Sequence, residues 1–162
     1  MRKQKGFSLI ELLIVVAIIL IIAAIAIPNL MRSRIAANEA SAAANIRTVN
    51  TAEVTYMTTY PSVGYSADLD ALAYGANASC PAAGPDSTSA CLIDNTLSKA
   101  VDATHVKSGY YFTYTLNANK TQYTLLATPQ SASTGVKNFF TDETAVIRYK
   151  ASAAASASDP AI

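Results

Sequence analysis

Few side chains of this sequence could do chemistry. The chain of 162 residues holds two cysteines, Cys80 and Cys91, and one histidine, His105. Two cysteines cannot make a zinc site alone, and His105 is too isolated to complete one. The sequence contains no GxSxG elbow, no P-loop and no HExxH motif. We therefore expect a protein that is not an enzyme and that uses no metal and no cofactor.

Two pairs of acids could be considered for calcium. Asp68 and Asp70 have the spacing that opens a calcium loop, but no third ligand, glycine or closing glutamate follows in register. A turn or a helix cap is the favoured interpretation there. Asp142 and Glu143 lie at the tip of an expected hairpin, where a solvated turn is favoured and calcium binding is the alternative.

One further acid stands inside an apolar run. Residues 7–27 are apolar except for Ser8 and Glu11. As a helix this run would be about 31 Å long, which matches the hydrocarbon thickness of a bilayer. Helix is the only single-segment solution in lipid, because every backbone donor and acceptor must be satisfied within the segment. Glu11 would cost about 2.5 to 3.5 kcal/mol there, so it is expected to have a cationic partner.

The residues before this run resemble a processing signal. Gly6 precedes Phe7, and the stretch KGFSLIELLIVVAII resembles the class III signal of type IV prepilins. In that family a prepilin peptidase cuts after the glycine and methylates the new amino terminus. The resemblance implies a leader at residues 1–6, cleavage between Gly6 and Phe7, and N-methylation of Phe7. The leader carries three basic residues: Arg2, Lys3 and Lys5.

Cleavage would give Glu11 its partner. In a homo-oligomeric helical filament, the α-ammonium of Phe7 can lie against Glu11 of a neighbouring chain. At about 4 Å and an effective dielectric near 20 the pair gains roughly 4 kcal/mol, which is comparable to the cost of burying the acid. Besides other copies, the resemblance implies three partners: the prepilin peptidase, inner-membrane lipid before assembly and an inner-membrane assembly platform.

The amino terminus has two alternative interpretations. An ordinary secretory signal would use the A-x-A sequence at residues 24–26, but the apolar run is longer than a usual signal core and Glu11 would have no purpose. A plain signal anchor carrying an extracytoplasmic binding domain would leave the Gly6–Phe7 junction and Glu11 as coincidences.

Beyond the membrane segment at residues 7–28, an amphipathic continuation is expected at residues 29–61. Pro28 removes a helical donor and clashes with the preceding turn, so a kink is predicted there. Residues 29–60 contain no Gly or Pro. Apolar side chains recur in this stretch at helical spacing: Ile35, Ala42, Ile46, Val49, Ala52, Tyr56 and Tyr60. A helix over residues 7–60 follows, ended by Pro61.

The rest of the chain predicts a connection, a sheet and a tail. Residues 62–103 are expected to form an αβ loop with short helical turns around 67–74 and 92–101. A disulfide is predicted between Cys80 and Cys91, because they are the only cysteines and both lie beyond the membrane. Residues 104–150 form the sheet, and residues 151–162 a flexible Ala/Ser-rich tail. Alternating patterns predict four antiparallel strands at 110–116, 123–127, 136–141 and 145–149.

The predicted fold class is α+β: a long bent N-terminal helix, transmembrane in its first half, packed on a roughly four-stranded antiparallel sheet, as in pilins. Without the leader, the chain has 9 basic and 11 acidic side chains, so no nucleic acid binding is indicated. The resemblance implies a pilus subunit for adhesion, motility or DNA uptake, or alternatively a pseudopilin of type II secretion. In the precursor and the monomer, the protein would be anchored in the inner membrane with its amino terminus cytoplasmic and its C-terminal domain extracytoplasmic. After assembly, the filament would be extracellular or periplasmic.

Overall fold

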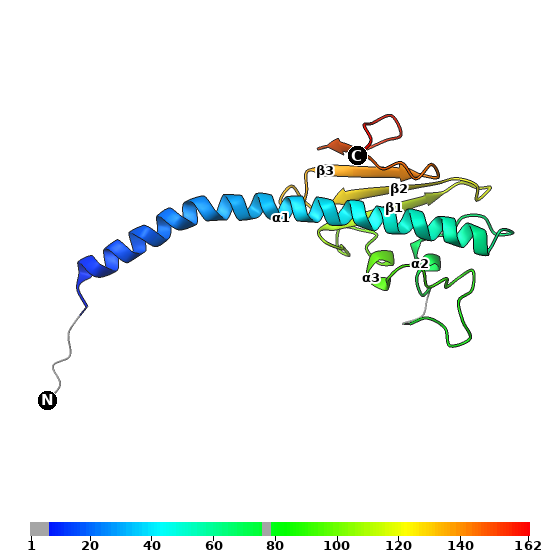
Figure 1. Ribbon diagram of the computed structural model, residues 1–162, viewed down its shortest axis with the longest axis horizontal. Helices are drawn as coiled ribbons and strands as arrows, with labels where there is room; N and C mark the ends of the chain where they lie inside the picture. The colour runs from blue at the N-terminus through cyan, green and yellow to red at the C-terminus, as the bar shows by residue number, and fades with distance from the viewer. Residues whose placement is uncertain (1–6, 76–78) are drawn as a thin grey trace. The chain divides into compact units, whose positions relative to one another are not determined.

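The computed structural model describes residues 7–75 and 79–162. They form a long helix, two short helices and four strands in the order α1, α2, α3, β1 to β4 (Figure 1). The chain divides into two compact units, of which one ends at Arg34 and the other is Ile35–Ile162. The predicted combination of a long N-terminal helix with a four-stranded antiparallel sheet is confirmed.

Helix α1 is Leu9–Thr59, 51 residues long, and agrees with the helix predicted for residues 7–60. It continues through Pro28 as helix on both sides. Proline here leaves the carbonyl of Ala24 without its intrahelical donor, which is the physical basis for a local bend. The kink itself stays a prediction.

The second half of α1 contributes one face to the core. The central members of the predicted stripe are buried, and Ile35 and Tyr60 at its two ends are half-buried. This face packs with side chains of the sheet, chiefly Tyr110, Phe112 and Leu125, in one hydrophobic cluster. Leu69, Leu72 and Leu97 of the α2 and α3 region complete the cluster. The periodicity of the sequence therefore predicted which side of the helix is covered.

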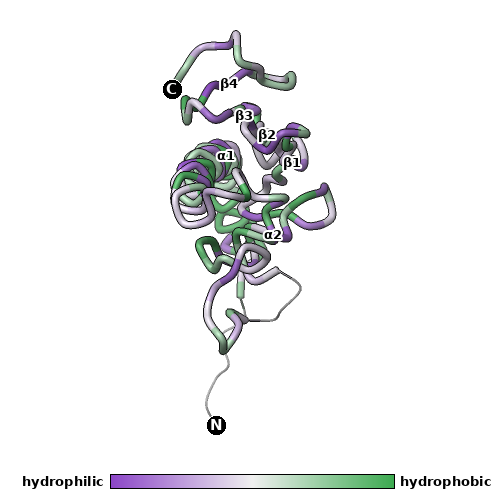
Figure 2. Tube along the Cα trace, turned by 90° about the vertical axis from the view of Figure 1, so that its right-hand side faces the viewer, coloured by the Kyte–Doolittle hydropathy of each residue, from purple (hydrophilic) through white to green (hydrophobic). Residues whose placement is uncertain are grey.

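The sheet consists of β1 (Tyr110–Leu116), β2 (Tyr123–Pro129), β3 (Lys137–Asp142) and β4 (Arg148–Ala151), paired antiparallel in that order. Figure 2 shows the four strands stepping side by side, with α1 on one side of the sheet. A turn joins β1 to β2, where Oδ1 of Asn117 accepts from the backbone N–H of Thr121 at 2.9 Å and of Gln122 at 3.1 Å.

The fourth strand begins later than predicted, at Arg148 instead of Ala145. A tight turn takes the intervening residues, because Oδ1 of Asp142 accepts the N–H of Thr144 at 3.0 Å and the carbonyl of Asp142 accepts the N–H of Ala145 at 2.9 Å. Ala145 has a φ of 59°, a left-handed conformation outside the β region that regular strands use. The alternating pattern of residue types thus begins one turn before the strand does.

The connection between α1 and the sheet holds α2 (Leu69–Leu72) and α3 (Asn95–Ser98), close to the two predicted helical turns. Asp68 caps α2 by accepting the N–H of Ala71 at 2.8 Å, and Asp94 caps α3 by accepting the N–H of Leu97 at 2.9 Å. The lysine Nζ of Lys99 lies 2.7 Å from Oδ2 of Asp70. The two caps fix the starts of α2 and α3, and the ion pair links the start of α2 to the end of α3.

The C-terminal tail, expected to be loosely held, has a defined path in the structure. Its last residues run back beside β4, where the carbonyl of Pro160 accepts the N–H of Tyr149 at 3.0 Å. The N–H of Ile162 donates to the carbonyl of Ile147 at 3.0 Å. Ala155 in the middle of the tail is buried.

Candidate functional site

The first described residues surround the predicted assembly acid. Ser8 precedes α1, and its backbone N–H donates to Oε2 of Glu11 at 2.9 Å. The carbonyl of Ser8 accepts the N–H of Leu12 at 3.3 Å as the helix starts. Glu11 therefore satisfies a donor that a helix start otherwise leaves free, as the glutamate of an S-x-x-E capping box does. Its negative charge in the first turn also complements the helix dipole.

The sequence did not lead to this cap, although Ser8 and Glu11 have the capping-box spacing. A cation was predicted as the partner of Glu11, whereas the structure gives it a backbone donor within its own turn. Phe7 is described and 79% exposed. Gly6, on the other side of the predicted cleavage point, lies outside the described residues. The cleavage, the methylation of Phe7 and the pairing of Phe7 with Glu11 stay predictions.

The first half of α1 is an uncovered apolar surface. Its most apolar window of 18 residues has a mean hydropathy of 3.3, and none of that window is buried. Within residues 7–75 and 79–162, α1 is the helix whose length and composition suffice to cross a membrane. An exposed apolar surface of this size indicates a site for lipid or for other apolar helices.

The two cysteines form a disulfide, as predicted. The Cα atoms of Cys80 and Cys91 are 5.9 Å apart, within the usual range for a bridge. One end of the closed loop is anchored, since the N–H of Cys91 donates to the carbonyl of Ala73 at 2.8 Å. The N–H of Ala90 likewise donates to the carbonyl of Ala71 at 2.8 Å. The bridge thus ties a loop to the segment that follows α2.

The acids considered for calcium are engaged within the protein. Asp68 caps α2 and Asp70 pairs with Lys99. Asp142 closes the turn before β4, and Oε1 of Glu143 accepts from Nε2 of Gln122 at 2.8 Å. Among the residues that the structure describes, no group of three or more His, Cys, Asp or Glu side chains is arranged to hold a metal ion.

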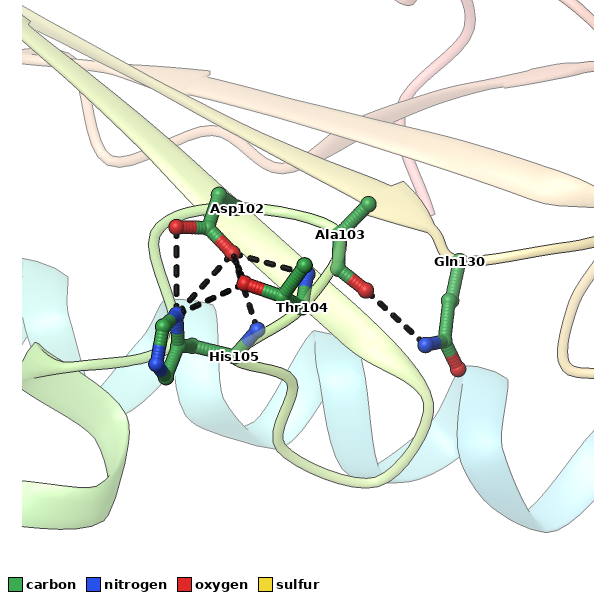
Figure 3. Close-up of polar contacts among 5 residues, drawn as sticks. All are labelled: Asp102, Ala103, Thr104, His105 and Gln130. Carbon is green, nitrogen blue, oxygen red and sulfur yellow. Dashed lines mark hydrogen bonds and ion pairs between the residues drawn. The ribbon is translucent and has the colours of Figure 1, made fainter.

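The single histidine belongs to an exposed turn (Figure 3). Oδ1 of Asp102 accepts the backbone N–H of Thr104 at 2.7 Å and of His105 at 2.9 Å, and Nδ1 of His105 lies 3.1 Å from the same carboxylate. Hydrogen bonds from Thr104 and His105 hold the pKa of Asp102 well below its usual range. Nε2 of Gln130 donates to the carbonyl of Ala103 at 2.8 Å, which fixes the turn against the end of β2. These contacts assign His105 a structural role.

A second acid, Glu53, was not singled out from the sequence. It lies on α1 well outside the predicted membrane segment at residues 7–28, and it is fully buried. Ser66 donates to it twice, from Oγ at 2.5 Å to Oε1 and from the backbone N–H at 3.1 Å to Oε2. Burial raises the pKa of Glu53, and the hydrogen bonds from Ser66 and Tyr114 oppose that rise. Its position between Val49 and Tyr56 on the apolar stripe is the signal that could have revealed it.

Together, a long N-terminal apolar helix and a four-stranded antiparallel sheet define a pilin-like α+β protein. Comparison with known proteins leads to the same class. Residues 1–27 match the family model described as the prokaryotic N-terminal methylation motif. The resemblance to the type IV pilin superfamily is therefore confirmed, by a motif that occupies the beginning of the chain.

Two curated proteins are similar over short segments. The type IV wide pilus major component PilA4 of Thermus thermophilus is 64% identical over 39 residues, which are 24% of this chain and 30% of that protein. The type IV major pilin protein PilA of Myxococcus xanthus is 44% identical over 54 residues, 33% of this chain and 24% of that protein. The matches thus span less than a third of either relative. No solved structure matches the chain.

Proposed function

We propose that this chain is the structural subunit of a type IV pilus and that it polymerises through the first half of α1. The observation that carries the proposal is the uncovered apolar surface of α1, which belongs to the same helix as the face buried against the sheet. In the membrane-held monomer lipid covers this surface. In the filament the equivalent helices of neighbouring copies replace the lipid.

Processing precedes assembly in this proposal. A prepilin peptidase cuts between Gly6 and Phe7 and methylates the new amino terminus of Phe7. The matched methylation motif supports both steps. The inner-membrane assembly platform then takes up the processed subunit from the lipid, with its amino terminus toward the cytoplasm and its sheet domain on the other side.

Glu11 then sets the register between copies. Its Oε2 is occupied by the N–H of Ser8, whereas Oε1 accepts no hydrogen bond from any residue in the described part of the chain. The α-ammonium of Phe7 from an adjoining copy fits that second oxygen, at a gain of roughly 4 kcal/mol for a pair about 4 Å apart at an effective dielectric near 20. The cap keeps the carboxylate at the helix start, so assembly does not have to order it.

Both relatives are described as pilins, which favours a pilus subunit over a pseudopilin of type II secretion. The test is a deletion strain complemented with the gene. Surface filaments that contain this chain by immunogold labelling are expected, and they should disappear in the deletion strain. Short periplasmic assemblies with loss of exported proteins, and no surface filaments, would identify a pseudopilin and overturn the proposal.

A further inference from the structure

The outer edge of β4 is already occupied by a strand-like segment. On the inner edge, Ser152 donates its N–H to the carbonyl of Val136 at 2.9 Å and so extends the pairing with β3. On the outer edge, Ile147 and Tyr149 bond to the C-terminal residues, and Arg148 pairs with Ala161 in an antiparallel bridge. Bonding alternates between the two sides along an antiparallel strand, so this edge is a regular acceptor for one more strand.

Two charged side chains of β4 contact the segment that lies along its outer edge. Nη1 of Arg148 donates to the carbonyl of Asp159 at 2.9 Å, and Nζ of Lys150 lies 3.5 Å from Oδ1 of Asp159. The other carboxylate oxygen of Asp159 accepts the N–H and the hydroxyl of Ser156, each at 2.8 Å. Hydrogen bonds from Ser156 also lower the pKa of Asp159, which keeps the carboxylate ionised beside Lys150.

The same charges decide what else can fit there. A second copy offering its own β4 would bring Arg148 and Lys150 against their equivalents, and like charges opposite one another destabilise a strand pair. The C-terminal segment of a second copy would instead bring Asp159 toward these cations, and its backbone could form the same hydrogen bonds with β4. The occupant with matching chemistry is therefore the C-terminal segment of another copy.

The link between β4 and the segment permits exchange. Residues 152–158 are all Ser or Ala, and the segment beyond them is held to β4 by two backbone hydrogen bonds, from Tyr149 to Pro160 and from Ile162 to Ile147. In a polymer the segments of neighbouring copies are present at high local concentration, which favours exchange of identical elements. We propose that the outer edge of β4 is a strand-acceptor site, filled in the monomer by the chain's own residues 159–162 and in the polymer by those of a neighbouring copy. This proposal rests on the polymerisation proposed above.

Cysteine pairs at positions 148 and 161 test the proposal. These residues face each other in the bridge without direct backbone bonds between them, an arrangement with Cα atoms close enough for a disulfide. One strain carries both Arg148→Cys and Ala161→Cys on the same chain, which removes the Arg148 contact and leaves Lys150 and the backbone bonds to hold the segment. A second strain expresses two differently tagged copies, one with each single substitution. As the matched control, Ala161→Cys is replaced by Ala153→Cys, which lies at the start of the link.

The double variant should give an internal bridge in the detergent-extracted monomer, seen as a gel shift that reductant reverses. The mixed strain should give a bridged dimer that carries both tags, at least fivefold more abundant than in the Ala153→Cys control. An internal bridge without mixed dimer above the control would overturn exchange. No bridge in either strain would overturn the acceptor site itself. Filaments are counted separately by microscopy, so a failure of the proposed pilus function is distinguishable from both results.

Discussion

Ser8 and Glu11 form a hydrogen bond of 2.9 Å between the backbone N–H of the first and Oε2 of the second. The acid in the apolar run thus has a partner before any assembly takes place. A carboxylate that caps its own helix loses less on burial than an unpaired one, since one of its oxygens stays bonded. The cap holds Glu11 at the helix start, where the proposed assembly brings the Phe7 ammonium of a neighbouring copy.

The mature chain is expected to begin at Phe7 and to carry one methyl group on its amino terminus. Intact-mass measurement of the protein extracted from membranes checks this. Ala26→Leu removes the A-x-A sequence and should leave the mature mass unchanged except for the substitution. A chain that starts at Ile27 would show that a secretory signal peptidase does the cutting.

Removing the disulfide should destabilise the sheet domain. Cys80 and Cys91 are separated by 11 positions, and the chain-entropy model gives roughly 3 kcal/mol for closing a loop of about this size. Replacing both by Ser should lower the free energy of unfolding in detergent by up to that amount, measured by denaturant titration. Reductant should lower the wild type to the same level and leave the double variant unaffected. Equal stability of all four samples would contradict the prediction.

Glu53→Gln should stabilise the protein at neutral pH. Because burial raises the pKa of Glu53 in the folded state above its unfolded value of 4.5, folding favours the protonated acid. The wild type therefore loses stability as pH rises from about 4.5 through the raised folded pKa, and the loss is constant above it. Gln keeps one of the two acceptor oxygens for Ser66 and cannot ionise. The difference in melting temperature between the Gln variant and the wild type should grow with pH over that window.

Glu53→Ala is the matched control, since it removes both the charge and the acceptor. The buried N–H of Ser66 would then lose its partner, at a cost of about 1 to 3 kcal/mol, whereas its hydroxyl can still donate to the carbonyl of Asp68 at 3.0 Å. This variant should melt below the Gln variant at every pH. If the difference between the wild type and the Gln variant did not change with pH, Glu53 would not titrate in the window, and a raised pKa would be wrong.

Periodicity in the sequence was enough to predict α1 and its buried face, because the apolar residues from Ala42 to Tyr56 recur on one side. Alternation likewise predicted β1 to β3 nearly to the residue. The start of β4 was not predictable, since the left-handed φ of Ala145 depends on contacts made by Asp142 and not on its own residue type. The path of the tail was not predictable for a related reason: its Ala/Ser composition hides the ionic contact of Asp159 with Lys150.

Substitutions at Glu11 address the central claim, that subunits assemble through a charge pair between this acid and Phe7 of a neighbour. Gln is the matched replacement, because an S-x-x-Q sequence can form the same cap as S-x-x-E. Ser8→Ala is a second control that retains the backbone N–H. Both variants should be inserted and cleaved normally, and Ser8→Ala should assemble like the wild type. Glu11→Asp should fall between wild type and Gln, since the charge is kept and the reach shortened.

The decisive measurement is the fraction of processed protein recovered in sheared filaments, normalised to the membrane-held monomer, for wild type and Glu11→Gln. The pair is worth roughly 4 kcal/mol at about 4 Å and an effective dielectric near 20, partly offset because the amide is cheaper to bury. We predict a loss of at least tenfold in filament yield for Glu11→Gln, with its processing intact. Equal yields would contradict the claim and show that apolar packing of the α1 helices alone is sufficient for assembly.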